Sequence, residues 1–103
     1  MVRKVLFSLQ CEIELLELNR YIAFERSLRV ADRVVDSIVD YCESLAVFPM
    51  RGRARSDLYP GLRIVGFRRR VSIAFVVDDS TVTIHGGFYA GREYERRWKY
   101  SVE

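Results

Sequence analysis

Arginine side chains crowd the part of this chain where chemistry could be done. Seven lie between residues 51 and 70, namely Arg51, Arg53, Arg55, Arg63, Arg68, Arg69 and Arg70. A guanidinium holds phosphate or carboxylate through paired hydrogen bonds, so arginines can stabilise a pentacovalent phosphate while another side chain moves a proton. The side chains that would move the proton are His85 and Tyr89. The candidates for holding the phosphate are Arg63, Arg68 and Arg70. This set predicts metal-free cleavage of RNA as one possible activity.

The same arginines also suit a docking surface for an acidic partner. Residues 1 to 50 carry six basic and eight acidic side chains, whereas residues 51 to 103 carry eleven and six. A surface of this charge would bind an acidic protein segment or a nucleic acid. A solvated basic face with no partner stays open, and His85 can equally be a polar residue on the exposed face of a strand. The candidate binding residues are Arg51, Arg53, Arg63, Arg68, Arg70, Tyr89 and Arg92.

Several classes of site have no sequence support. The two cysteines, Cys11 and Cys42, have neither metal-ligand spacing nor a CxxC motif, and the chain has one histidine. We expect both to be buried, reduced thiols, and we expect no metal site. Phosphate-binding glycine loops and nucleophile motifs are also missing from the sequence, so no cofactor is expected.

Two helices must precede the arginines. The first is predicted over Leu9–Glu25, with Ser8 as its N-cap and apolar residues spaced four, three and four apart. The second begins near Ser27, its expected N-cap, and is stopped by Phe48-Pro49. The link between them is short, so we expect an antiparallel helical hairpin whose apolar stripes a sheet must cover.

Strands supply that sheet. They are predicted over residues 2 to 7, Leu62–Phe67, Val71–Val77 and Thr81–His85, with residues 49 to 61 as a crossover loop. Gly86-Gly87 predicts a bulge or a place where another backbone comes close. From Arg92 the chain could form a short helix. The expected fold is α+β in the order β-α-α-β-β-β, an antiparallel sheet packed against a helical hairpin with a short C-terminal helix or tail.

Size and hydropathy predict one domain over residues 1–103 in the cytoplasm. A chain of this length supports one hydrophobic core. No apolar run approaches the roughly 20 residues that span a bilayer. The apolar run after the first basic pair is also too short for a secretory signal.

Four short motifs follow one another along this framework. The first helix carries Glu14-Leu15, Leu18 and Tyr21-Ile22; then come Leu45-x-x-x-Pro49-x-x-Gly52-Arg53, Asp57-Leu58-Tyr59-Pro60-Gly61-Leu62-Arg63, and finally Phe88-Tyr89-Ala90-Gly91-Arg92-Glu93-Tyr94-Glu95. In this order the chain resembles the RelE/ParE superfamily of toxins from bacterial type II toxin–antitoxin systems. The Tyr-x-Gly-Arg ending is most similar to the ParE branch, also called plasmid stabilisation proteins.

The resemblance implies a small cytoplasmic toxin that inhibits growth and is neutralised by a cognate antitoxin. That antitoxin would be ParD-like, with an acidic C-terminal segment that wraps the helical hairpin and sheet. ParE-type toxins inhibit DNA gyrase by binding it, so gyrase is the expected target. RelE-type toxins instead cleave mRNA on the ribosome, and this endoribonuclease alternative stays open. A non-toxic basic binding domain is the third possibility.

Overall fold

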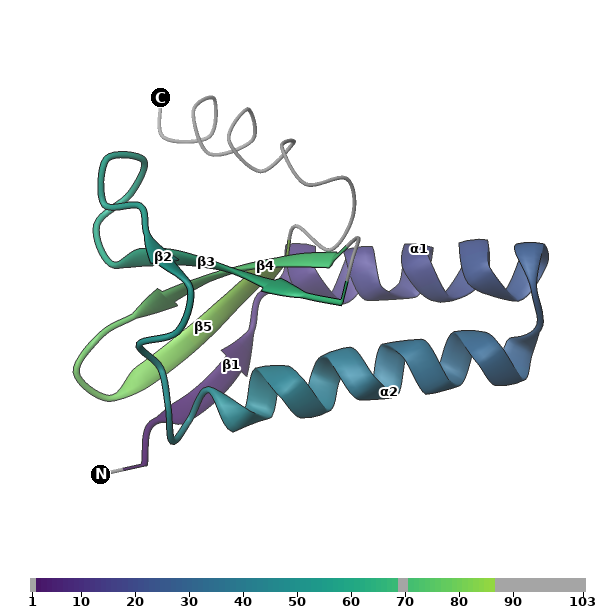
Figure 1. The fold of residues 1–103 in the computed structure, drawn as a ribbon, viewed down its shortest axis with the longest axis horizontal. Helices are drawn as coiled ribbons and strands as arrows, with labels where there is room; N and C mark the ends of the chain where they lie inside the picture. Colours follow the sequence, from purple (N-terminus) through teal and green to yellow (C-terminus); the bar gives the residue numbers. More distant parts are fainter. Residues whose placement is uncertain (1, 69–70, 87–103) are drawn as a thin grey trace.

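Two long helices follow the first strand and fold back on each other (Figure 1). The computed structural model describes residues 2–68 and 71–86. Helix α1 spans Leu9–Glu25 and helix α2 spans Leu28–Ser44. Both predicted N-caps are confirmed, because the hydroxyl oxygens of Ser8 and Ser27 accept hydrogen bonds from the backbone N–H groups three residues later. The predicted helical hairpin is therefore present.

The sheet has five strands in the order β1-β5-β4-β3-β2. They are β1 (Lys4–Phe7), β2 (Arg53–Ala54), β3 (Leu62–Phe67), β4 (Val71–Val77) and β5 (Thr81–Gly86). The α+β class and the β-α-α-β-β-β order of the predicted elements are confirmed. One pairing differs from the expected antiparallel sheet. Strand β1 runs parallel to β5, while the other three pairings are antiparallel.

The parallel pairing follows from the path of the chain. The helical hairpin brings the backbone back to the start of β1, where the Arg3 N–H donates a hydrogen bond of 3.0 Å to the carbonyl oxygen of Ala46. Strand β3 therefore starts at the same end of the sheet as β1. Two antiparallel reversals, through β4, give β5 that same direction. A first strand placed beside β5 must consequently be parallel to it.

Strand β2 is the second difference, because residues 49 to 61 were expected to be loop throughout. It has only two residues, Arg53 and Ala54, which pair with Ile64 and Arg63 of β3. Two residues are too few to show the alternation from which a strand is predicted. The strand exists because the crossover loop is pressed along the edge of β3.

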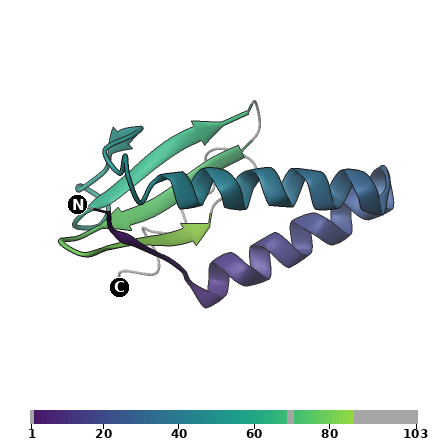
Figure 2. The same cartoon turned by 90° about the horizontal axis from the view of Figure 1, so that it is seen from below.

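The helices cover one face of the sheet, as the two views show (Figures 1 and 2). The core between the layers contains residues from both helices, β3, β4 and β5: Cys11, Leu18, Ile22, Ala31, Ile38, Cys42, Leu45, Val65, Ile73, Phe75, Val82 and Ile84. A smaller buried cluster of Leu62, Ile64 and Ala74 lies apart from it, with Leu58 and Val76 packed against it. Residues of β3 and β4 thus contribute to two apolar clusters.

Both cysteines are buried and form no disulfide with each other, as predicted. The pKa of the Cys42 thiol is raised to about 12, chiefly by burial and to a smaller extent by the nearby Cys11 and Glu43. The Cys42 thiol is therefore protonated at neutral pH and acts as a packing group. Within the part of the chain that the structure describes, no helix is long and apolar enough to cross a membrane.

Candidate functional site

The crossover loop is held in place by Arg63. Its Nε donates a hydrogen bond to the carbonyl oxygen of Arg51 at 3.0 Å, and its Nη2 donates to the carbonyl oxygen of Gly52 at 3.3 Å. Gly52 itself has a left-handed φ of 74°, and a Cβ added there would lie 2.1 Å from the carbonyl oxygen of Ile64. Arg63 and Gly52 together therefore fasten the loop to β3.

The rest of the crossover also has a structural explanation. Arg55 and Asp57 form a two-pronged ion pair, with Nε to Oδ1 at 3.0 Å and Nη2 to Oδ2 at 2.9 Å. Hydrogen bonding from Arg55 holds the pKa of Asp57 below its ordinary value. Gly61 has φ 81°, and a Cβ there would meet the carbonyl oxygen of Val77 at 2.9 Å. The residues of the Asp57 to Arg63 motif thus form and stabilise the tight turn that leads into β3.

Aromatic rings and arginines meet where α2, the following loop and the end of β3 come together. The Arg51 guanidinium carbon lies 5.4 Å from the Tyr41 ring centroid and 5.5 Å from that of Phe48. Tyr41 stacks on Phe67 with centroids 4.7 Å apart. The Arg68 guanidinium carbon lies 5.4 Å from the Phe67 centroid. We call these five residues, Phe48, Arg51, Tyr41, Phe67 and Arg68, the arginine–aromatic row.

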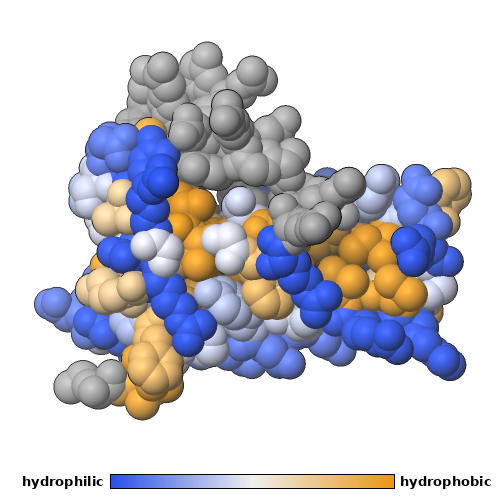
Figure 3. Space-filling view, viewed as in Figure 1, coloured by the Kyte–Doolittle hydropathy of each residue, from blue (hydrophilic) through white to orange (hydrophobic). Residues whose placement is uncertain are grey.

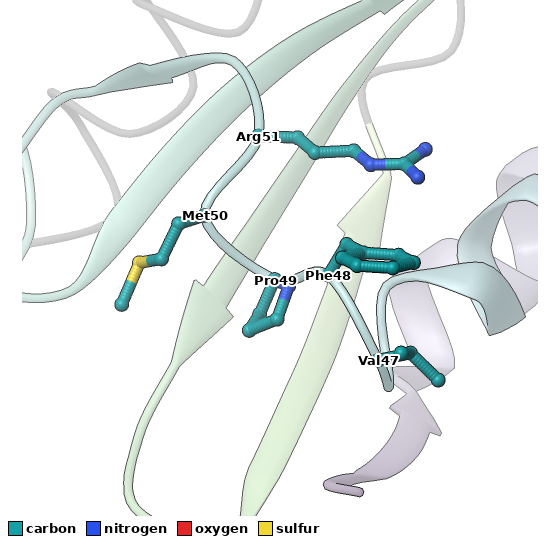
Figure 4. Close-up of a pocket in the computed structure, with 5 residues that line it drawn as sticks. All are labelled: Val47, Phe48, Pro49, Met50 and Arg51. Carbon is teal, nitrogen blue, oxygen red and sulfur yellow. The ribbon is translucent and has the colours of Figure 1, made fainter.

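The row is accessible at both ends. Phe48 and Arg68 are exposed, and the three residues between them are half-buried. Figure 4 shows the Arg51 side chain extending over the Phe48 ring, while Met50 points to the other side of the loop. A shallow pocket is lined by residues 47 to 51. Arg51 lies near two rings and Arg68 near one, and these contacts orient both guanidiniums, so the row presents ordered positive charge beside apolar surface.

An open sheet edge adjoins the row. Strand β2 pairs with β3 only at Arg63 and Ile64, so among the described strands none pairs with this edge from Val65 to Phe67. Gly66 has open space where a side chain would be. An unpaired strand edge beside apolar rings and arginines can accept an extended peptide.

The predicted catalytic residues are not gathered in one place. Arg63 is on β3 and His85 on β5, with β4 between them, which separates their backbones by about 10 Å. The Arg63 guanidinium is already bonded to the loop. His85 is the extra residue of a bulge in β5, since Ile84 pairs with Phe75 and Gly86 with Ala74. The sequence predicts this bulge one residue later, at Gly86-Gly87. Arg70, Tyr89 and Arg92 lie outside the described residues.

The other predicted residues occupy separate positions. Arg53 is exposed on β2, away from the ring contacts of the row. Gly86 is buried with φ 107°, and a Cβ there would lie 2.7 Å from a carboxylate oxygen of Glu14. A side chain therefore makes the close approach that was expected of a backbone. Among the described residues, no three His, Cys, Asp or Glu side chains are grouped so that they could hold a metal ion.

Sequence reasoning found two members of the row, Arg51 and Arg68, and missed its three rings. Tyr41 lies three residues after Ile38 on α2, and this 3/4 spacing is the signal that could have placed it beside the buried face. The contact with Phe67 joins residues 26 positions apart, and no local pattern reveals such a pair.

Comparison with known proteins identifies one family. The family model described as "ParE toxin of type II toxin-antitoxin system, parDE" matches residues 5–85. A solved structure titled "Chromosomal ParDE TA system from P. aeruginosa" contains a chain of similar fold, with a TM-score of 0.73 and 18% sequence identity. That similarity covers 86% of this chain and 98% of the other, and it shows the fold. No curated protein matches this chain.

Proposed function

The chain belongs to the ParE toxin family of type II toxin–antitoxin systems, and we propose that it acts in the cytoplasm by binding and inhibiting DNA gyrase. Membership of this family supports the gyrase target. The position of Arg63 favours inhibition by binding over catalysis, because its guanidinium is used to hold the crossover loop. An inhibitor that acts by binding needs an exposed contact surface, but it does not need a pair of side chains that transfer a proton.

We propose further that a ParD-like antitoxin neutralises the toxin by docking on the arginine–aromatic row. The row is the observation that carries this proposal. Its two guanidiniums can form charge-assisted hydrogen bonds with acidic side chains, and its rings offer apolar anchors between them. The adjoining edge of β3 can pair with an extended segment. Figure 3 also shows apolar surface over the part of the hairpin that extends beyond the sheet, which an amphipathic segment would cover.

Gyrase inhibition is tested with purified toxin, gyrase and relaxed plasmid. We expect the toxin to block supercoiling and to trap cleaved DNA, and we expect addition of the antitoxin to restore supercoiling. A matched reaction with heat-unfolded toxin is the control. Normal supercoiling at saturating toxin would overturn the gyrase proposal.

A ribosome-dependent endoribonuclease is the second candidate, favoured by one observation. His85 is half-buried at the bulge of β5, and bulges often redirect a side chain beside an active site. This candidate predicts cut mRNA in ribosomes programmed in vitro and loss of cutting in His85→Ala. Intact mRNA at saturating toxin, together with inhibited gyrase, would exclude it.

A further inference from the structure

Helix α1 is apolar on two opposite sides. Its buried residues, Cys11, Leu18 and Ile22, face the core. The exposed residues Leu9, Ile13, Leu16, Arg20 and Phe24 are spaced four, three, four and four apart, which places them within an arc of about 80° on the other side of the helix. We call these five residues the outward face of α1. Figure 2 shows α1 along the lower margin of the molecule, with α2 and the sheet on its other side.

The outward face exposes more apolar surface than a solvated helix needs. Leu9 is 73% exposed, Ile13 41%, Leu16 61% and Phe24 89%. Single exposed apolar residues are ordinary, but four along one helix form a patch of the kind that marks an interface. Helix α2 differs, because apart from Leu28 its exposed positions are charged: Arg29, Asp32, Arg33, Asp36, Asp40 and Glu43. The patch is therefore particular to α1.

The charges around the outward face make it complementary to itself. Glu12 and Glu17 border its N-terminal half, and Arg20 is the one charged residue within it.

When two copies of α1 are laid antiparallel about a two-fold axis near Leu16, Leu9 of each copy meets Phe24 of the other. Arg20 of each copy then lies opposite Ile13, between the other copy's Glu12 and Glu17. Among the described residues, none of these three charged groups forms an ion pair within one molecule.

We propose that the toxin self-associates into a two-fold dimer through the outward face of α1. A parallel arrangement would place Arg20 against Arg20 and Glu12 against Glu12, so the charges select the antiparallel one. An acidic antitoxin segment does not suit this face, because Glu12 and Glu17 would repel it. The outward face shares no residue with the arginine–aromatic row, so this inference is independent of the proposed function.

The interface is small, which sets the strength of the dimer. Helix α1 has 17 residues and is about 25 Å long. One helix pair buries less than the roughly 800 Å² per partner of a standard interface. We therefore expect monomer at about 1 μM and dimer at about 100 μM.

Sedimentation of the full chain across this concentration range tests the proposal. We expect the mass to rise toward that of a dimer for the wild type and to stay monomeric for Leu16→Glu. Met50→Glu is the matched control, because Met50 is 65% exposed but lies on the crossover loop, and it should dimerise like the wild type. Far-ultraviolet circular dichroism establishes that the variants have equal helix content. A monomeric wild type at 100 μM, or a dimer unaffected by Leu16→Glu, would overturn the proposal.

Charge reversal tests the antiparallel arrangement separately. The Arg20→Glu variant makes the charges of the face wholly acidic, and the Glu12→Arg/Glu17→Arg variant makes them wholly basic. Each should remain monomeric alone at 100 μM, and an equimolar mixture should form a heterodimer. The arrangement is wrong if the mixture stays monomeric.

Discussion

Arg63 uses its guanidinium inside the molecule. As the last residue of the Asp57 to Arg63 motif, it was a candidate for both phosphate binding and antitoxin binding. The structure shows it donating two hydrogen bonds to backbone carbonyls of the crossover loop. A residue's type suggested its chemistry correctly, since arginine does act here as a forked donor, but the acceptors are the chain's own carbonyl oxygens.

Replacing Arg63 should therefore lower stability. We expect Arg63→Ala to reduce the free energy of unfolding by about 2 kcal/mol, because two hydrogen bonds from a charged group are lost. Urea unfolding followed by circular dichroism measures this. Arg53→Ala, which removes an exposed arginine from β2 beside the same crossover, should stay within about 0.5 kcal/mol of the wild type. Equal unfolding midpoints for Arg63→Ala and Arg53→Ala would contradict the clamp.

Cys42 should lower the stability of the folded protein at alkaline pH. Its pKa is raised from 9.0 in the ordinary state to about 12 in the folded chain, chiefly by burial. The folded state thus favours the neutral thiol, so this contribution to stability is complete below pH 9 and is lost as the pH rises from 9 toward 12. Between pH 8 and pH 10 the unfolding midpoint of the wild type should fall more steeply than that of Cys42→Ala. Parallel pH profiles of the two proteins would disprove the assignment.

At the scale of elements, sequence periodicity predicts the helices and strands that form within one segment of the chain. The 3/4 spacing of α1, the caps at Ser8 and Ser27 and the alternation ending at Ile84 all correspond to observed structure. The parallel pairing of β1 with β5 was not foreseen, because it depends on the path of the whole chain. Strand β2 was missed because its two residues become a strand only through contact with β3.

The glycines of β3 and its crossover offer a matched test of element geometry. Gly52→Ala should lower the free energy of unfolding by more than about 2 kcal/mol, since φ is 74° and the new Cβ would collide with the Ile64 carbonyl. Gly66→Ala should be neutral or stabilising by up to about 1 kcal/mol, because Gly66 has an ordinary φ and open space beside it. Thermal unfolding compares them. A Gly52→Ala variant as stable as Gly66→Ala would show that the loop does not need this geometry.

At the scale of the whole molecule, the arginine–aromatic row and the outward face of α1 suit two different kinds of partner. The arginine–aromatic row joins α2, the crossover loop and β3, and its positive charge suits an acidic segment. The outward face of α1 is bordered by acidic residues in its N-terminal half and suits a second copy. The basic excess of residues 51 to 103 indicated the first surface from the sequence. The second is not predicted from the sequence, because the sequence analysis assigns α1 a single apolar stripe that faces the core.

The central claim is that the row is where the antitoxin docks, and its affinity is the most direct measure. Calorimetric titration of the chain with the C-terminal segment of the ParD-like antitoxin should show binding weakened about 100-fold or more in Arg51→Glu/Arg68→Glu. Two charge-assisted contacts of about 1.5 kcal/mol or more each are lost and replaced by repulsion. Arg29→Glu reverses an exposed charge on α2 about 18 Å along the helix from Tyr41 and should bind like the wild type. Wild-type affinity in the double variant would contradict the account.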